Sequence, residues 1–321
     1  MRAPPILVLA VSLALPGCAG GPQEEPRGSW GGIVEERPEP PPPLTGALSV
    51  PTPSVAPGPT REFTAQEKAF FEEAWGTFRR GEAAWPENKA RWMAMGPEAT
   101  GLLAENLYRA LVASRVKGAL HLVDEAKKDL VLVGEGAVPV LVGGLAIRAV
   151  KTDAGEEIRV GQEVLHDAAE ALSLIGTPSV PGLMDIARAG ETSQVTEALH
   201  ALGNIGDPRA EATVLEIARS GDWQQRSAAV LALRKYTSEA AVVRMVQALE
   251  DPESLVVERA AQALATGRHR TAAPDVVDAL ERSLRDGRVL PVRACVFVLR
   301  SLTGETLGED PAGWRAKLGV R

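Results

Sequence analysis

The chain repeats itself at an interval of about 30 residues, and this periodicity limits its possible folds more than any other feature. Residues 171–178 (ALSLIGTP) match residues 201–208 (ALGNIGDP). The segments that follow also agree, because residues 183–190 (LMDIARAG) are similar to residues 214–221 (VLEIARSG). A fixed period of this length is typical of a solenoid, in which each short unit packs only against its neighbours.

Each repeat is predicted to consist of two helices joined by a tight turn. The first helix is rich in Ala, which lets neighbouring helices approach closely, and the second helix has an apolar stripe. Asp207 suits the cap of a second helix, and Pro208 suits its first position. Glycine at the end of the first helix permits a left-handed turn. Equivalent turns are expected at Gly96, Gly134, Gly176, Gly206, Thr237 and Gly267, at intervals of 38, 42, 30, 31 and 30 residues.

The two longer intervals indicate that the amino-terminal repeats are irregular. A charged insertion at residues 151–161 accounts for the interval of 42. A helix at about 64–80 is expected to cap the amino-terminal end of the stack. At the other end, Asp310 and Pro311 suit the start of a short helix, and Trp314 is expected to cover the last repeat. Such caps are needed because a terminal repeat has no further neighbour.

This pattern resembles the HEAT repeat, particularly the short bacterial type that also occurs in phycobilisome lyases. That type runs Asp, Val-Arg, Ala-Ala, Ala-Leu-Gly and then Asp-Pro-x-Ala. Residues 222–233 carry the first half, with Arg226 at the arginine position, and residues 206–210 carry the second half. The resemblance extends over residues 84–321 and is most specific over 163–287. It implies an all-α fold, an α-α superhelix of the HEAT-repeat or armadillo type, with about six repeats.

The composition agrees with closely packed helices and argues against nucleic-acid binding. Aromatic residues make up only 4% of the chain, and the net charge is −7. An acidic chain lacks the basic footprint that nucleic-acid binding requires. Cys18 lies at the end of the leader, so no internal disulfide framework is expected. Cys295 lies in an Ala- and Val-rich helix and is expected to be a buried small hydrophobe.

Residues 1–17 are typical of a bacterial lipoprotein signal peptide. Arg2 supplies a positive start, and the apolar run at 6–15 is too short to span a bilayer. The sequence LPGC at 15–18 resembles the lipobox of bacterial lipoproteins. This resemblance implies that Cys18 receives a diacylglycerol and becomes the acylated amino terminus. Ala19 then favours the outer membrane, facing the periplasm. An ordinary secretory leader with an incidental cysteine is the alternative.

Residues 18–61 are predicted to be the lipidated Cys18 and a disordered, proline-rich tether. Eleven prolines lie between residues 19 and 60, including the run at 40–43. Such a segment cannot bury enough apolar surface to offset its chain entropy. A spacer is the favoured interpretation, and a ligand for an aromatic groove is the alternative. The solenoid is expected over residues 62–321, with its carboxyl-terminal cap at 288–321.

No motif in the sequence predicts catalysis. Residues 130–139 look like a strand followed by a dinucleotide loop, but Pro139 occupies the third glycine position. The segment fits the repeats as a helix–turn–helix. His166 and Asp167 resemble a metal-hydrolase dyad, but the other ligands are missing from the sequence. We therefore expect no catalytic residues, no metal and no cofactor.

Two rows of polar residues form the candidate binding face. The first row, with a spacing of 31 residues, is Asp185, Glu216, Gln247 and Asp278, and the second row is Arg188, Arg219, Glu250 and Glu281. Second helices line the concave face in the HEAT family, so both rows are expected there. The alternative is an ordinary solvated face held by pairs such as Asp185–Arg188 and Glu216–Arg219. As a binding face, its end at Glu250, Asp278 and Glu281 would be negative and favour a basic partner.

The sequence therefore predicts a membrane-anchored scaffold that binds proteins in the bacterial cell envelope and is not an enzyme. The alternative is a lyase-like or chaperone-like protein that handles a cofactor or a polypeptide. A polar groove beside the two rows would favour protein docking, whereas an apolar or aromatic groove would favour ligand handling.

Overall fold

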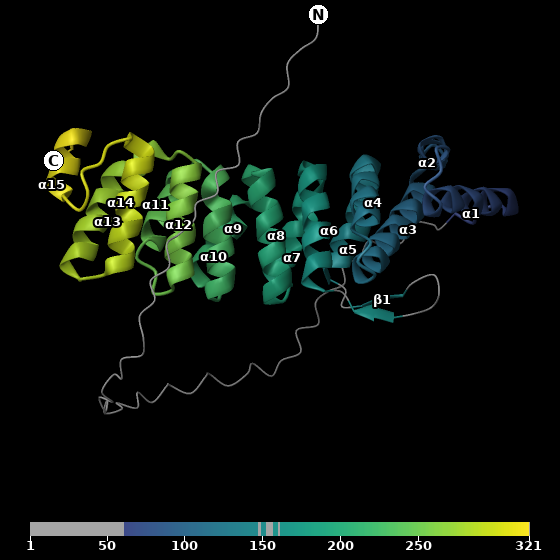
Figure 1. Ribbon diagram of the computed structural model, residues 1–321, viewed down its shortest axis with the longest axis horizontal. Coiled ribbons are helices and arrows are strands. Elements are labelled where there is room, and N and C mark those ends of the chain that lie inside the picture. The colour runs from purple at the N-terminus through teal and green to yellow at the C-terminus, as the bar shows by residue number, and fades with distance from the viewer. Residues whose placement is uncertain (1–60, 147–148, 152–156, 160, 321) are drawn as a thin grey trace, which may run out of the picture. The chain divides into compact units, whose positions relative to one another are not determined.

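The computed structural model describes residues 61–146, 149–151, 157–159 and 161–320. In these ranges the chain forms 15 α-helices, short 3-10 turns and one small hairpin. The helices follow one another in chain order from α1 to α15 (Figure 1). The predicted signal peptide, Cys18 and the tether lie outside the described residues.

The helices alternate between two layers, as expected for repeats of two helices. The first helices of the repeats are α2 (Trp85–Met93), α4 (Leu120–Val133), α6 (Gln162–Ile175), α8 (Thr192–Ile205), α10 (Trp223–Ala232) and α12 (Ser254–Thr266). The second helices are α3 (Pro97–Val116), α5 (Val138–Ala146), α7 (Val180–Ala189), α9 (Glu211–Ser220), α11 (Glu239–Ala248) and α13 (Ala273–Arg285). From α4 to α14 (Val289–Thr303) the even-numbered helices pack on one another and form the first-helix layer. From α3 to α15 (Pro311–Leu318) the odd-numbered helices form the second-helix layer.

The turn inside each repeat lies at the predicted position. Gly206 ends α8 with a φ of 69°, in the left-handed conformation that glycine adopts without strain. Asp207 then caps the next turn, because its carboxylate accepts the backbone N–H of Arg209 at 2.9 Å. The last repeat differs, since Gly267 has a φ of −71° and Arg268 takes the positive φ of 54°.

Small residues let the first helices pack closely. Ala198, Ala201, Ala229 and Ala232 are buried between α8 and its neighbours. A Cβ atom added to Gly203 would lie 2.6 Å from the Cα of Ala232. The first helices are rich in Ala because their backbones lie so close together that larger side chains would not fit between them.

A short hairpin occupies the charged insertion. Strand β1 (Ala149–Lys151) pairs antiparallel with β2 (Glu157–Arg159), with Val150 opposite Ile158. The sequence did not predict these strands, because three residues are too few to give a recognisable alternation of polar and apolar positions. The hairpin lies between α5 and α6 and accounts for the longest repeat interval.

Aromatic residues close both ends of the stack. At the amino-terminal end, α1 (Ala65–Arg79) packs on α2, and Phe71 stacks on the fully buried Trp92 with ring centroids 4.6 Å apart. At the other end Trp314 is fully buried on α15, as predicted, and its indole N–H donates to the carbonyl of Gly308 at 2.8 Å. Asp310 occupies the helix start, but its side chain makes no capping hydrogen bond.

The stretch Leu120–Ala146 has the length and apolarity of a membrane span, with a mean hydropathy of 1.6. It consists of α4, the 3-10 turn Gly134–Ala137 and α5, so it is the helix pair of one repeat. Leu130, Leu141 and Leu145 are fully buried in the core. Residues 130–139 therefore form the predicted helix–turn–helix.

Candidate binding faces

All eight residues of the two predicted rows belong to the second-helix layer. They lie on α7, α9, α11 and α13, except Glu250, which lies two residues after the end of α11. Glu250 and Asp278 are half-buried, and the other six side chains are exposed. Because successive second helices pack on one another, the rows run across four neighbouring repeats of the same layer.

Only one of the two predicted pairs within a helix is formed. Arg188 lies 3.7 Å from the carboxylate of Asp185, and it also donates to the hydroxyl of Thr213 on α9 at 2.8 Å. Within the described ranges, no ion pair joins Glu216 to Arg219. Among the described residues, ion pairs between the two rows therefore form on α7 but not on α9.

Arginine side chains pair with the acids at the carboxyl-terminal end of the rows. Arg282 contacts Glu250 at 3.0 Å. Arg315, on α15, contacts Asp278 at 2.7 Å and Glu281 at 2.8 Å. The hydrogen bond and the charge of Arg315 hold the pKa of Glu281 below its usual value. Each of the three carboxylates predicted to form a negative patch therefore has an arginine partner.

A hollow of about 390 Å³ lies beside the middle of the rows. It is lined by Arg219 from α9 and by Glu239, Ala240, Val243, Arg244 and Gln247 from α11. The guanidinium of Arg244 donates to the carbonyl of Ala218 at 2.9 and 2.5 Å. Most of the residues around this hollow are thus polar, which favours protein docking over ligand handling.

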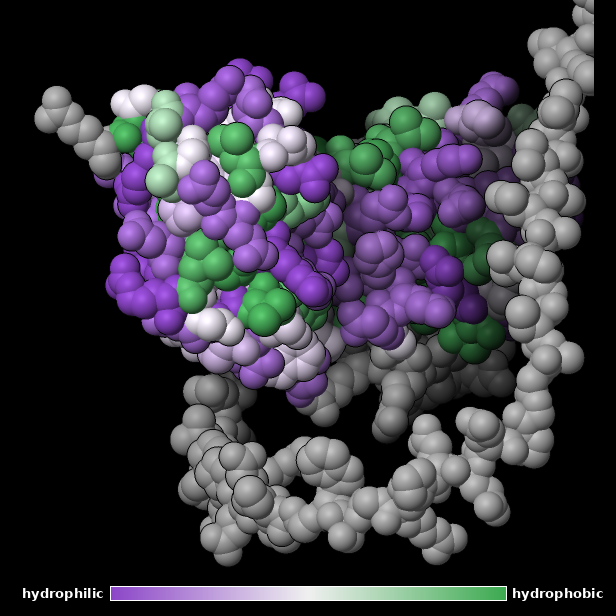
Figure 2. Space-filling model, turned by 60° about the vertical axis from the view of Figure 1, so that its left-hand side comes forward, coloured by the Kyte–Doolittle hydropathy of each residue, from purple (hydrophilic) through white to green (hydrophobic). Residues whose placement is uncertain are grey.

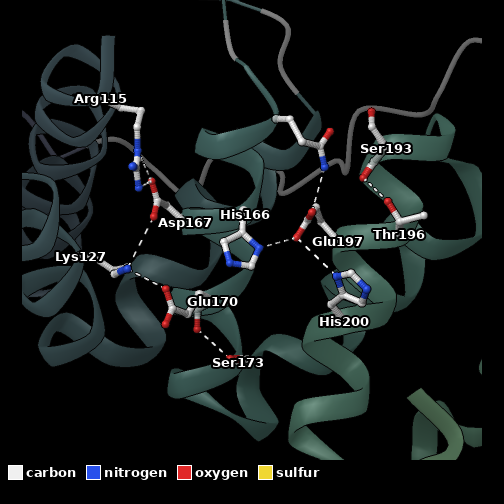
Figure 3. A network of polar contacts seen from close by, with 11 residues as sticks. Arg115, Lys127, His166, Asp167, Glu170, Ser173, Ser193, Thr196, Glu197 and His200 are labelled. Carbon is white, nitrogen blue, oxygen red and sulfur yellow. Dashed lines mark hydrogen bonds and ion pairs between the residues drawn. The ribbon is translucent and has the colours of Figure 1, made fainter. Parts of the chain in front are cut away.

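A second polar cluster links the first helices of successive repeats (Figure 3). Asp167 on α6 is buried and accepts a hydrogen bond from the Nε of Arg115 at 2.8 Å. Lys127 on α4 lies 3.5 Å from Asp167 and 2.6 Å from Glu170. These contacts join α3, α4 and α6 and leave the carboxylate of Asp167 fully engaged.

The same cluster continues to α8 through the buried Glu197. Its carboxylate accepts from the amide of Gln162 at 2.8 Å and lies 3.1 Å from Nδ1 of His166 and 3.8 Å from Nδ1 of His200. Burial opposes the charge of Glu197, but the hydrogen bonds and charges of the two histidines outweigh it, so its pKa is lowered. In Figure 3 the two histidines approach Glu197 from different sides.

His166 and Asp167 do not act together as a dyad. His166 contacts Glu197, whereas Asp167 contacts Arg115 and Lys127. In the part of the chain that the structure describes, no group of three or more His, Cys, Asp or Glu residues is arranged to hold a metal ion. Cys295 is fully buried, as predicted, and burial raises the pKa of its thiol to about 12.

Sequence reasoning missed the links between repeats. Asp167 and Glu197 are separated by 30 residues, the same interval as the turns that follow them, and both face the neighbouring repeat. The sequence contained one signal for these links, an acidic residue at the same position of two Ala-rich helices. Apart from His200, which lies on α8 with Glu197, their partners belong to preceding repeats and follow no regular spacing.

The face in Figure 2 is mostly hydrophilic, and its hydrophobic residues lie in small separate groups. A second hollow of about 390 Å³ lies on the first-helix layer and includes the exposed Leu132 and Leu174. Asp124, Lys127 and Lys128 lie around it.

The fold and the repeated contacts between neighbouring helix pairs define an all-α solenoid. The family model for HEAT repeats matches residues 195–265 and 212–300. The chain therefore contains HEAT repeats, and its layers form the predicted α-α superhelix. No curated protein sequence matches the chain.

Two solved structures are similar to this chain. An engineered protein from the Northeast Structural Genomics Consortium is 22% identical and has a TM-score of 0.37, with 63% of this chain and 96% of that chain covered. Human deoxyhypusine hydroxylase in complex with glycerol is 16% identical and has a TM-score of 0.31, with 64% of this chain and 98% of that chain covered. Neither similarity assigns an activity to this chain.

Proposed function

We propose that this protein is a lipid-anchored HEAT-repeat scaffold that binds other proteins in the bacterial cell envelope. HEAT repeats support a role in protein interaction. The observation that carries the proposal is the arrangement of equivalent polar side chains on four successive second helices beside a mostly polar hollow. A series of such positions offers a partner several contacts along one layer.

The polar hollow favours this role over the lyase-like or chaperone-like alternative. Handling of an apolar cofactor or polypeptide requires an apolar groove, whereas only Ala240 and Val243 are apolar around the hollow beside the rows. We also propose that the protein is not an enzyme. The buried carboxylates of Asp167 and Glu197 are engaged in links between helices and do not face a shared cavity.

The anchor is the second part of the proposal and rests on the lipobox-like sequence at residues 15–18. Several acyl chains on Cys18 would hold the protein stably at the membrane, since each buried methylene contributes about 0.8 kcal/mol. The phycobilisome-lyase type of the repeats and the outer-membrane location, which Ala19 favours, belong to the same proposal.

Cell fractionation of the Cys18→Ser variant tests the anchor. We expect the wild type in the membrane fraction and the variant outside it, with no acyl mass on the variant. A wild type that is itself soluble in the periplasm would contradict the anchor.

Cross-linking in the intact envelope, followed by recovery of the protein, tests the scaffold. If the protein is a scaffold, the same partner protein should be recovered with it in repeated experiments. The same experiment with the fully folded Cys18→Ser variant shows whether this interaction requires the membrane. Recovery of no protein above a mock control would count against the scaffold, whatever the result for the anchor.

A further inference from the structure

We propose that the hollow between α9 and α11 is a docking site for an acidic side chain of the partner protein, with Arg219 and Arg244 as its carboxylate-binding residues. This inference rests on the proposed scaffold function and names the chemistry of its partner. The sequence predicted a basic partner, whereas this site would bind an acidic one. The reason is that the three acids at one end of the second-helix layer are paired with arginines, whereas, within the described ranges, the arginines at the hollow are not paired with acids.

The three acids at one end of the layer already have arginine partners. Glu250 is paired with Arg282, and Asp278 and Glu281 are paired with Arg315. A basic partner would have to displace Arg282 and Arg315, so its new ion pairs would only replace the three that already exist. This end of the layer is therefore a poor site for a basic partner.

Within the described ranges, neither arginine at the hollow forms an ion pair with a carboxylate. Arg219 is exposed, and no carboxylate pairs with it in the part of the chain described. The guanidinium of Arg244 is bonded to the neutral carbonyl of Ala218. Burial lowers the pKa of Arg244, and the nearby charges of Arg226 and Arg219 lower it further against the opposing charge of Asp251. The two arginines at the hollow thus repel each other, and an anion beside both would relieve this repulsion.

Glu239 is the one acid around the hollow, and it has another role. It is the first residue of α11, where the positive end of the helix dipole stabilises a negative charge. Within the described ranges it forms no ion pair with Arg219 or Arg244. Its charge leaves the hollow with a single net positive charge, which suits one carboxylate better than a phosphate or a polyanion.

The remaining residues around the hollow suit a peptide segment. A guanidinium offers paired N–H donors that match the geometry of a carboxylate. The exposed amide of Gln247 supplies a further donor, and Ala240 and Val243 offer a small apolar surface. The occupant is therefore a segment of a partner protein with an Asp or Glu beside a small aliphatic residue.

A peptide titration tests the site. The probe is a dye-labelled peptide with both ends blocked and the central sequence Val-Glu-Val, and the matched probe has Gln in place of Glu. Fluorescence anisotropy is measured with the full-length protein in detergent. We expect the Glu peptide to bind at least about tenfold more tightly than the Gln peptide, since hydrogen bonds to charged groups are the stronger ones. Its binding should weaken with added salt.

Three variants locate the binding on the protein. Arg219→Gln should reduce the affinity for the Glu peptide by about tenfold while helicity and melting temperature stay unchanged, because this side chain is exposed. Arg244→Gln should also weaken binding, although it removes the bonds to Ala218 as well. The exposed Arg285→Gln, on α13, is the matched control and should bind like the wild type.

Equal binding of the Glu and Gln peptides, no saturable binding at millimolar peptide, or wild-type affinity of Arg219→Gln would overturn the proposal. Failure of this site is distinguishable from failure of the scaffold function. A partner that cross-links to the wild type and equally to Arg219→Gln would leave the scaffold in place and exclude this docking site.

Discussion

At the scale of single residues, buried carboxylates connect one repeat to the next. Asp129, Asp167, Glu197 and Asp251 are all buried. Arginine or lysine pairs with three of them; Arg226, for example, holds Asp251 with two hydrogen bonds of 3.1 and 3.0 Å. Glu197 differs, because its partners are Gln162 and two histidines.

This difference predicts how the Glu197→Gln variant responds to acid. The pKa of Glu197 is lower in the folded protein than its usual value of 4.5, so the unfolded chain binds its proton more readily. Its contribution to stability is therefore present above pH 4.5 and is lost as the pH falls through the folded pKa. Urea unfolding between pH 7 and pH 3 should show a smaller loss of stability below pH 4.5 for Glu197→Gln than for the wild type.

Glu258 provides the control for this measurement. It is exposed on α12, and no ion pair involves it within the described ranges. Glu258→Gln should leave the acid dependence of the wild type unchanged. Parallel stability profiles for Glu197→Gln and the wild type would show that the buried carboxylate makes no pH-dependent contribution.

At the scale of the helices, the close approach of α8 and α10 predicts a strong effect at Gly203. A methyl group there would lie 2.6 Å from the Cα and 2.7 Å from the Cβ of Ala232, and a backbone atom cannot move aside easily. Gly203→Ala should destabilise the protein by about 1–3 kcal/mol through overpacking. Urea unfolding monitored by circular dichroism measures the change.

Gly101 on α3 is the matched control, because an added Cβ would meet no atom within 4 Å. Gly101→Ala should stabilise the protein by about 0.5–1 kcal/mol, since alanine restricts the unfolded chain. Equal effects of the two substitutions would contradict the close approach of α8 and α10.

The carboxyl-terminal cap gives a second prediction at this scale. Trp314 is fully buried and hydrogen-bonded to Gly308, so Trp314→Ala should cost about 3–5 kcal/mol locally. Because each repeat contacts only its neighbours, the loss should spread little beyond α13. Hydrogen exchange should accelerate over α13–α15 while α4–α8 remain protected.

Trp223, 43% exposed at the start of α10, is the control for the cap. Trp223→Ala should change stability and exchange only slightly. Uniform acceleration of exchange along the chain in Trp314→Ala would show that the repeats unfold as one unit and that the cap has no local role.

The sequence predicted the helix pairs, the positions of the turns and the closing role of Trp314. These features repeat at a fixed interval or depend on neighbouring residues, such as Asp207 and Gly206. The pairing of Arg315 with Asp278 and of His166 with Glu197 was not predicted. Those contacts depend on how helices of different repeats pack against one another. The spacing of residues along the sequence does not determine this packing.

At the scale of the whole molecule, a HEAT-repeat solenoid presents two layers of different character. The first-helix layer uses its buried polar residues to join repeats, as Asp167 and Glu197 do. The second-helix layer has a row of exposed polar residues and the hollow at Arg219 and Arg244. We therefore propose that partners bind the second-helix layer.

Site-specific photo-cross-linking in the native envelope tests this assignment most directly. A photoreactive amino acid is placed at Gln247, beside the hollow on α11, and in a second strain at Glu258, exposed on α12 of the first-helix layer. We expect a discrete cross-linked protein from position 247 and none from position 258. Cross-linking from position 258 alone, or none from position 247 in cells that contain the folded protein, would contradict this assignment.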